Sequence, residues 1–533
     1  MEPLVIALAF AAGLFFRRIG YPPLLGYLLA GFVGNWLGWG DADSLAPLAE
    51  AGILLLLFTI GLKLYPSDLA PRYVWGSAIL HMLIAVPLTA AVIYLVGALY
   101  QPLSFDSHLA AWTLAFSLSF SSTVLAVKLF EERGETASFY ATIAIGILVV
   151  QDILAVVYLV FASGYLPSVW ALGLLALPLA IPLLSRLFSL IGHGELLLLS
   201  GVLFAFGASE LFVFVDLKGG LGALVMGMLI AQAHKPKAKE LYTQLFGLKN
   251  LLLIGFFLQI GYYGLPEPTL VLVAMILGLL ITLRPIIYFG LLIFFGLRAR
   301  TAWLTGLSLF NYSEFGLIVA AIAQQAGILE QEWVTTLALS MAVSFAFATP
   351  VNRKAHELYI RYADKLQKLE SKERLPEEVI GSLGDAAIAI LGMGRVGLGA
   401  FDALREAGHQ HVVGVEENFS LTEQRNAEGW PCVHGDASDR DFWEQTGLND
   451  CELILVSLSN HRESVRVARL ARKLGFNNTL AIAIRFPDES KELEELGCLT
   501  FYRYQDVGRD FTEYVLGERQ NAKLVAPSAT GGA

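Results

Sequence analysis

The chain has 533 residues and a mean hydropathy of +0.60; 56% of its residues are apolar and only 16% are charged. Because a soluble globular chain is usually about 25% charged, this composition excludes a disordered protein, a coiled coil and a secreted disulfide scaffold. The charges are divided unevenly, with 33 charged residues (9%) in residues 1–350 and 51 (28%) in residues 351–533. The sequence therefore predicts a membrane-embedded first part and a soluble second part.

The formal net charge of −10 belongs mostly to the second part and argues against nucleic acid as a partner. All three cysteines, Cys432, Cys451 and Cys498, lie in that part. Their spacing matches no zinc motif and does not suggest disulfides, so we expect reduced, structural thiols in a cytosolic domain.

Thirteen segments of the first part are apolar enough to span a membrane, which takes about 20 residues. They are residues 3–16, 22–38, 48–64, 74–99, 108–130, 138–163, 167–188, 195–214, 217–233, 246–262, 268–297, 301–325 and 331–350. Basic residues gather in every second connection, whereas the other connections are mainly acidic. By the positive-inside rule, this pattern predicts an N-terminus outside the cell and a cytoplasmic C-terminal part, with lipid surrounding the spans.

Three charged residues lie well inside predicted spans, namely Asp152, Arg284 and Glu314. An intramembrane charge is costly, so each is a candidate for function; the alternative is a structural charge that is paired or faces a polar cavity. Asp152 is the strongest candidate, because it has no basic neighbour in the sequence. It also follows Gln151, another polar residue in an apolar run.

Two spans contain polar clusters near their middle. The fifth span reads LAFSLSFSSTVLAV and the twelfth reads LSLFNYSEFGLIV. Such clusters are expected where helices break and line a site, although serine and threonine also make ordinary helix-packing contacts. The two clusters occupy equivalent positions in two six-span halves separated by the seventh span. This layout predicts an inverted-repeat transporter with crossed, broken helices.

Several segments resemble the cation:proton antiporter-2 family and, within it, the Kef-type potassium/proton antiporters. They are LGYLLAGFVGNW (25–36), LAEAGILLLLFTIGLKL (48–64), SFSSTVLAVKLFEERG (119–134), VVQDILAV (149–156), GLGALVMGMLIA (220–231) and NYSEFGLIV (311–319). The resemblance implies a secondary transporter in the bacterial inner membrane. It maps the family's ion-site pair to Gln151 and Asp152, and its basic residue before the second crossing to Arg284, where relatives more often have lysine.

Exchange follows from one titrating carboxylate, because a proton and a cation compete for Asp152. A neutral oxygen set around it suits K⁺, which is large and weakly hydrated. Arg284 is expected to balance the opposed helix ends or Asp152 itself. Exchange of one cation for one proton would be electroneutral, which remains a hypothesis. The predicted ion-site residues beside Asp152 are Gln151, Ser121, Ser122, Thr123, Arg284 and Glu314.

In the second part, residues 351–382 predict a charged helical linker that ends near Pro376. Residues 383–520 begin with a buried strand, a glycine-rich turn at G-x-G-x-x-G spacing and a helix. Glu416 lies 19 residues after Gly397, near the spacing of a ribose-binding acid. Further strands and helices alternate, which predicts a parallel, Rossmann-like sheet. Residues 521–533 have no core-forming pattern and predict a disordered tail.

These segments, with Gly435–Ser438, resemble the TrkA-N (RCK) nucleotide-binding domain that regulates potassium channels and transporters. The resemblance implies AMP or NAD(H) as a regulatory ligand and a homodimer formed through both domains. Asp436 could instead cap the following helix, and Arg485 could form a surface ion pair. We see no catalytic constellation, so we expect a sensor and not an enzyme. The predicted ligand contacts are Gly392, Gly394, Arg395, Val396, Gly397, Glu416, Glu417, Asp436, Ala437, Ser459 and Arg485.

Two departures from Kef-type relatives change one expectation. Lys235, Lys237 and Lys239 replace an acidic connection, and Lys63 stands where relatives usually have glutamate. We therefore do not expect glutathione gating or predict an accessory oxidoreductase. The leading prediction is exchange of K⁺, or alternatively Na⁺, for H⁺. Two competing hypotheses are a nucleotide-gated potassium channel, although no TVGYG-type filter is present, and a membrane-anchored sensor in which Asp152 is structural.

Overall fold

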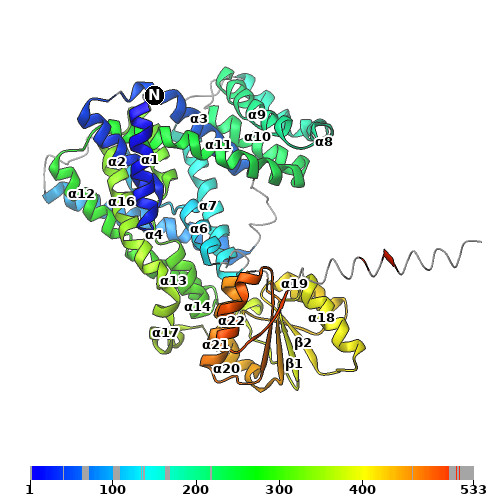
Figure 1. Ribbon diagram of the computed structural model, residues 1–533. Helices are drawn as coiled ribbons and strands as arrows, with labels where there is room; N and C mark the ends of the chain where they lie inside the picture. The colour runs from blue at the N-terminus through cyan, green and yellow to red at the C-terminus, as the bar shows by residue number, and fades with distance from the viewer. Residues whose placement is uncertain are drawn as a thin grey trace, which may run out of the picture. The chain divides into compact units, whose positions relative to one another are not determined.

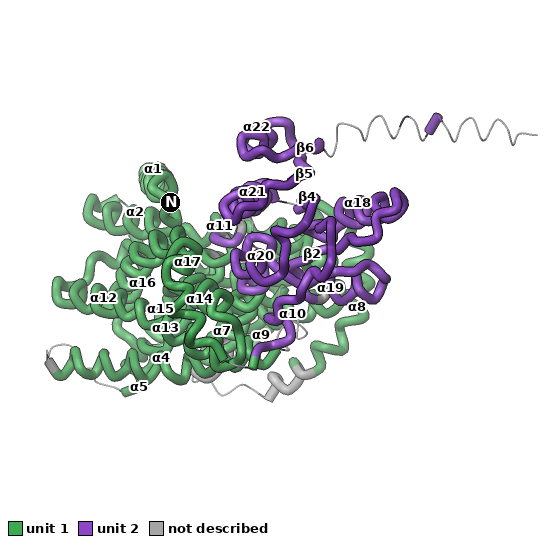
Figure 2. The backbone as a smooth tube through the Cα atoms, turned by 90° about the horizontal axis from the view of Figure 1, so that it is seen from below, with its two compact units in different colours: residues 1–128, 142–373 green, residues 129–141, 374–533 purple. Residues whose placement is uncertain are grey.

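The computed structural model describes residues 3–516, apart from residues 40, 63–70, 100–107, 134, 136, 137, 163–168, 216–218, 372, 459, 503–511, 513 and 514. The predictions for Lys63, Ser459 and residues 521–533 therefore lie outside the described residues. The chain divides into two compact units, coloured separately in Figure 2. The first consists of residues 1–128 and 142–373, and the second of residues 129–141 and 374–533.

The first unit is helical, and the described residues of each of the thirteen predicted spans are mostly helical (Figure 1). By length and hydropathy alone, six helical segments of the described chain could cross a membrane. The helices are α1 (Pro3–Arg18), α2 (Pro23–Leu37), α3 (Ala46–Gly61), α4 (Arg72–Leu99), α5 (His108–Ser117), α6 (Thr123–Arg133), α7 (Phe139–Ala162), α8 (Ile181–Ile191), α9 (Glu195–Phe214), α10 (Gly219–Ala233), α11 (Lys235–Tyr262), α12 (Pro268–Leu280), α13 (Leu283–Phe294), α14 (Ala299–Ser308), α15 (Glu314–Gln325), α16 (Gln331–Arg353) and α17 (Ala355–Leu366).

The predicted breaks in the fifth and twelfth spans are confirmed. The fifth span is divided into α5 and α6, and the twelfth into α14 and α15, with five non-helical residues in each gap. The eleventh span is interrupted more gently between α12 and α13, and the seventh begins as a 3₁₀ helix (Val169–Ala180) before α8. The two broken spans therefore differ from their neighbours as the polar clusters indicated.

Two boundaries differ from the sequence prediction. Helix α11 begins at Lys235 and not near residue 246, because His234 caps the helix by accepting from the Lys237 amide at 3.4 Å. The helix that follows the last span, α17, ends at Leu366, well before Pro376. It packs on α14, and the indole nitrogen of Trp303 donates to the carbonyl of Ala355 at 3.1 Å. This part of the linker is therefore packed against the first unit.

The second unit contains a parallel sheet of six strands among its described residues, in the order β3-β2-β1-β4-β5-β6. This is the doubly wound order, with its reversal between β1 and β4. The strands are β1 (Ile388–Leu391), β2 (Val412–Glu416), β3 (Cys432–His434), β4 (Leu453–Val456), β5 (Thr479–Ile484) and β6 (Leu499–Tyr502). The helices are α18 (Arg395–Glu406), α19 (Phe419–Ala427), α20 (Arg440–Thr446), α21 (His461–Lys473) and α22 (Ser490–Glu495).

Helices cover both faces of this sheet (Figure 1). In β1, Ile388 and Ile390 join one core with Phe401 of α18, whereas Ala389 and Leu391 join a second core with α20, α21 and α22. A strand covered on both sides reads as a continuous apolar run, which is why IAIL shows no alternation. All three cysteines are buried and unbridged, and burial raises the pKa of Cys432 to about 12 and of Cys451 to about 11.

The short segment Leu129–Ala141 also belongs to the second unit. Within that unit, buried Glu135 pairs with Arg466 of α21, and Arg466 donates to the carbonyl of Arg133 at 3.0 Å. The ring of Phe139 meets His434 edge to face, with their centroids 6.5 Å apart. An ion pair, a hydrogen bond to a backbone carbonyl and a ring contact thus hold this segment in the unit.

Candidate functional site

The first break supplies backbone groups to the interior of the first unit. Helix α5 ends at Ser117 and α6 begins at Thr123, so several backbone groups between them bond to side chains of other elements and not along a helix. Ser119, Ser121 and Ser122 in this break are all buried. A buried backbone group without a partner costs free energy, so side chains from other helices must satisfy these groups.

The second break is held largely by its own residues. Ser313 caps α15 by accepting from the Phe315 amide at 3.0 Å, and the Asn311 side chain donates to the carbonyl of Ser308 at 3.1 Å. The Tyr312 amide donates to Ser344 of α16 at 3.1 Å. Serine and asparagine are thus common in this break because they replace lost helical bonds locally.

The two breaks cross and are bonded directly to each other. The Ser122 amide donates to the Asn311 side chain at 2.6 Å, and the Ser121 hydroxyl donates to the carbonyl of Leu309 at 3.1 Å. The backbones approach so closely that a β-carbon on Gly316 would lie 1.9 Å from the carbonyl oxygen of Ser117. Only glycine fits at this crossing.

Arg284 joins both breaks from the start of α13. Its guanidinium donates to the carbonyls of Leu118 (2.6 Å) and Phe120 (2.9 Å) in the first break, and of Asn311 (2.7 Å) in the second. It also donates to the Ser121 hydroxyl at 2.8 Å and lies over the ring of Tyr312. A buried cation here offsets the partial negative charge of the helix C-termini that face it. This geometry matches the expected balance of opposed helix ends.

Asp152 lies on α7 and is 4% exposed. The hydroxyl of Thr123, the first residue of α6, donates to its Oδ2 at 3.4 Å. The carboxylate therefore lies at a helix N-terminus, where a negative charge is favoured and where a bound cation would be shielded from lipid. The structure thus brings two of the predicted ion-site residues together.

Gln151, beside Asp152, is fully buried, and both ends of its amide are engaged. Its oxygen accepts from the Ser121 amide at 3.0 Å, and its nitrogen donates to the carbonyl of Ser119 at 3.3 Å and to the hydroxyl of Tyr288 at 2.9 Å. These bonds fix the shape of the first break. Gln151 therefore connects the helix that carries Asp152 to the residues around it.

Glu314 begins α15 and is also buried, at 3% exposure. Its Oε2 accepts from the Ser122 hydroxyl at 2.8 Å, whereas its Oε1 has no hydrogen-bond partner among the described residues. Since Ser122 and Thr123 are adjacent, the two buried carboxylates are held by neighbouring residues of one break. The arrangement offers an ion two carboxylates and two hydroxyls, and one carboxylate oxygen, Oε1 of Glu314, has no partner among the described residues.

Sequence reasoning missed three residues around this site. Tyr288 of α13 accepts from Gln151 of α7, and Asn311 of the second break accepts from the Ser122 amide of the first. Buried Lys249 of α11 lies within electrostatic reach of Glu314. Asn311 was recognisable only as part of a polar cluster, and tyrosine in a span gives no signal. Lys249 had a signal, because it lies inside the tenth predicted span.

In the second unit, the glycine-rich turn connects β1 to α18. Gly392 has a positive φ of 95°, and a β-carbon on Gly397 would lie 2.0 Å from the Gly392 carbonyl oxygen. Gly394 caps α18 and has open space beside it. Arg395 and Val396 are exposed at the helix start. A cradle kept open by glycines at a helix N-terminus fits a phosphate group.

Glu416 and Glu417 follow at the end of β2. The carboxylate of Glu416 accepts from the Met393 amide at 2.9 Å and from the Asn418 amide at 3.1 Å, so it supports the glycine-rich turn. The carbonyl of Glu417 is 2.9 Å from Nε2 of His434. Glu416 thus lies against the turn, and its contact with a ribose stays a prediction.

The remaining predicted contacts lie on different loops. Asp436 accepts from the amide and the hydroxyl of Ser438, both at 2.7 Å, whereas Asp439 caps α20, so the helix-cap alternative for Asp436 is wrong. Ala437 is buried, and its carbonyl accepts from Trp443. Arg485 is exposed and has no ion-pair partner among the described residues, so the surface ion pair is not formed there.

A helical bundle whose two broken helices cross beside buried carboxylates defines the class of secondary transporters. The chain belongs to the sodium/hydrogen exchanger family, whose transmembrane region residues 5–353 match. It is a multi-pass cation/proton antiporter and not an enzyme. Residues 388–501 match the TrkA-N domain, so a soluble domain of regulatory type follows the transporter.

Three proteins illustrate what the chain is similar to. The glutathione-regulated potassium-efflux system protein KefC of Salmonella schwarzengrund is 28% identical over 485 residues, covering 85% of this chain and 74% of KefC. The sodium/proton antiporter MjNhaP1 of Methanocaldococcus jannaschii is 13% identical, with a TM-score of 0.48 over 68% of this chain and 96% of its own. The NAD(P)-binding domain of an exopolyphosphatase-related protein from Archaeoglobus fulgidus is 20% identical, with a TM-score of 0.23 over 25% of this chain and 98% of its own.

Proposed function

We propose that the protein exchanges K⁺ for H⁺ at Asp152, and that a nucleotide bound at the glycine-rich turn controls the exchange. One observation carries the proposal for the ion: a carboxylate that is 4% exposed lies at the N-terminus of α6, beside a helix break. A proton and a cation exclude each other at such a group. Each turnover therefore carries one or the other across.

The choice of K⁺ rests on the oxygen set and on the similarity to KefC. The hydroxyls of Ser122 and Thr123 each reach a carboxylate, and neutral hydroxyl and carbonyl oxygens suit a weakly hydrated cation. Gln151 and Arg284 have a different part in this proposal. Their bonds to the breaks position the ligands, and the Arg284 charge offsets one of the two negative charges when both carboxylates are ionised.

The nucleotide part of the proposal rests on the glycine cradle. Gly394 leaves open space at the start of α18, and the helix N-terminus favours a phosphate. Arg395 is the exposed cation nearest to it in the sequence. Glu416, whose carboxylate also accepts from two backbone amides, is proposed to accept from a ribose hydroxyl. A bound AMP or NAD(H) would add the negative charge of its phosphate and the adenine ring to this edge of the sheet.

The test is ion-driven proton movement in proteoliposomes, followed with a pH-sensitive dye inside the vesicles. Adding K⁺ outside is expected to change the internal pH with the wild-type protein and to leave it unchanged with Asp152→Asn. Asp152→Glu keeps a carboxylate and is the matched variant, expected to retain partial exchange. Equal activity of wild type and Asp152→Asn would overturn the proposed mechanism.

The same vesicles distinguish the candidate cations and nucleotides. Na⁺ or Li⁺ in place of K⁺ identifies the transported cation, and a larger response to Na⁺ would replace K⁺ in the proposal. AMP and NADH are added inside and outside in separate runs. Equal exchange at different clamped membrane potentials would support one-for-one, electroneutral stoichiometry, whereas potential-dependent exchange would contradict it.

A further inference from the structure

His81 is a buried titratable residue that the proposed exchange does not use. It lies on α4 in the apolar run AILHMLIAV and is 0% exposed. Neither ring nitrogen has a hydrogen-bond partner among the described residues. Because buried polar groups are almost always bonded, an imidazole in this state needs an explanation.

The ring of His81 is in contact with the support of the ion site. It stacks on Tyr288 of α13, with centroids 4.1 Å apart and planes 9° from parallel. The hydroxyl of Tyr288 accepts from Gln151, which in turn bonds to both Ser119 and Ser121 in the first break. His81 therefore packs on Tyr288, which in turn bonds to Gln151, the residue beside Asp152.

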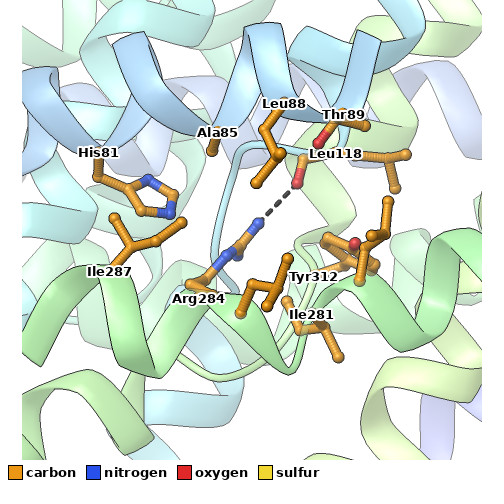
Figure 3. A pocket seen from close by; sticks show the side chains of 11 residues that line it. His81, Ala85, Leu88, Thr89, Leu118, Ile281, Arg284, Ile287 and Tyr312 are labelled. Atoms are coloured by element: carbon orange, nitrogen blue, oxygen red, sulfur yellow. Dashed lines mark hydrogen bonds between the residues drawn. The ribbon is translucent and has the colours of Figure 1, made fainter. Parts of the chain in front are cut away.

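His81 also faces Arg284 across a small pocket (Figure 3). The pocket has room for about one water molecule and is lined otherwise by Thr89, Tyr312 and aliphatic side chains of α4, α12 and α13. Arg284 cannot move away, because four hydrogen bonds hold its guanidinium on the breaks. A proton on His81 would therefore place a second positive charge beside a fixed one.

The other helices packed against His81 offer no negative charge in the described pocket. Helix α13 contributes Arg284 and Tyr288, and the second break contributes Tyr312. Helix α12 has no titratable residue, and His108 of α5 pairs with Tyr94, thirteen residues beyond His81 on α4. An imidazolium at this position has no counter-ion in the pocket, so its protonation must disturb the stack on Tyr288.

We infer that His81 is a positioning residue of the exchange site that works only while its ring is neutral, so that its protonation lowers the maximal exchange rate at acid pH. The inference rests on the proposed function. It predicts an effect different from competition at Asp152: protons that compete there raise the KM for the cation, and saturating cation overcomes them. Protonation of His81 lowers the maximal rate, which no cation concentration restores.

The experiment measures K⁺-driven proton movement in proteoliposomes at several K⁺ concentrations between pH 5 and 8, and fits KM and the maximal rate at each pH. Wild type is expected to lose maximal rate only toward the acid end of this range, because a buried imidazole beside the fixed charge of Arg284 resists taking up a proton. His81→Phe keeps an aromatic ring on Tyr288 but cannot titrate. Its maximal rate is expected to be at least about threefold less sensitive to pH, with the pH dependence of KM unchanged.

Two further variants serve as a control and as an alternative to His81→Phe. Ser77→Ala removes another buried, unbonded polar group one turn earlier on α4 and is expected to behave as wild type. If His81→Phe does not fold, His81→Gln is used. Its maximal rate, however low, is expected not to show the fall at acid pH (the acid limb) that wild type shows. An unchanged acid limb in a folded His81 variant, or a wild-type maximal rate that does not fall at acid pH, overturns the inference. Absence of exchange in wild type overturns the proposed function instead.

Discussion

The hydrogen bonds that build the ion site join residues further apart in the sequence than those around the nucleotide site do. In the first unit, the Ser121 amide reaches Gln151, 30 positions away, and the Ser122 amide reaches Asn311, 189 positions away. In the second unit, the Met393 amide reaches Glu416, 23 positions away, and the Ser457 hydroxyl reaches the Gly392 carbonyl, 65 positions away, whereas Asp436 bonds to nearby Ser438. A long-range site has shared supports and is expected to fail as a whole, whereas a locally built site loses one element at a time.

The largest effect is expected from Arg284→Ala, because this side chain supports both breaks. Its removal leaves buried carbonyls of Leu118, Phe120 and Asn311 without their donors, at a cost of about 3 kcal/mol or more. We expect loss of exchange and a large drop in the unfolding temperature in detergent. Arg284→Lys keeps the charge but not the planar fork of the guanidinium. Its exchange rate and unfolding temperature should lie between those of wild type and Arg284→Ala. An Arg284→Ala protein as stable as wild type would contradict the shared-support view.

Gly316→Ala tests the crossing itself. The added β-carbon would lie 1.9 Å from the Ser117 carbonyl oxygen, so the two breaks must move apart. We expect at least a tenfold loss of exchange rate, measured in proteoliposomes, with a smaller loss of stability than for Arg284→Ala. Gly290→Ala is the matched control, since Gly290 of α13 has nothing within 4 Å. Equal rates for the two variants would mean that the crossing tolerates displacement.

Gly397→Ala makes the corresponding change in the second unit. Its β-carbon would lie 2.0 Å from the Gly392 carbonyl oxygen and would distort the glycine-rich turn. We expect nucleotide binding, measured by calorimetry on the full chain, to weaken at least tenfold, while exchange without nucleotide persists. Gly399→Ala, two residues further along α18 with open space around it, is the control. Loss of basal exchange in Gly397→Ala would contradict the separation between the sites.

The smallest effect concerns Glu463 on α21. Burial, with Asp436 acting in the same direction, raises the pKa of Glu463 to about 8. A carboxyl whose pKa is raised by folding costs no stability below its ordinary range near pH 4.5, and stability is lost as the pH rises from there to about 8. Glu463→Gln should therefore gain unfolding temperature relative to wild type at pH 8 and match it at pH 4.5. A gain at both pH values would show that ionisation is not the cause.

The fold could be predicted from the sequence because its signals are local. Hydropathy located the helical segments of the first unit, polar clusters located both breaks, and the glycine spacing located the turn between β1 and α18. Boundaries set by packing were not accessible. Helix α11 extends far before its apolar run because His234 caps it, and the start of α17 is held on α14 by Trp303; hydropathy records neither contact.

The candidate ion site could be predicted only in part. Asp152, Arg284 and Glu314 stand out because a charge is rare in an apolar span. Tyr288 and His81 do not, because their role depends on partners from α7 and α13 that no local pattern names. Gln151 was recognised, but its position between Ser121 and Tyr288 required the folded chain.

The distance in sequence between the breaks has a consequence for biosynthesis. The first break and Asp152 enter the bilayer long before Arg284 and Asn311 have been made, about 160 and 190 residues later. At about 5–20 residues per second, the nascent chain waits about 10–40 s for the partners of its first break. During that time the exposed carbonyls of residues 118–122 and the Asp152 carboxyl must be sheltered by water, lipid headgroups or the insertion machinery. Chains interrupted before α13 are therefore expected to be recognised and degraded, which makes completion of the second break a quality checkpoint for the antiporter.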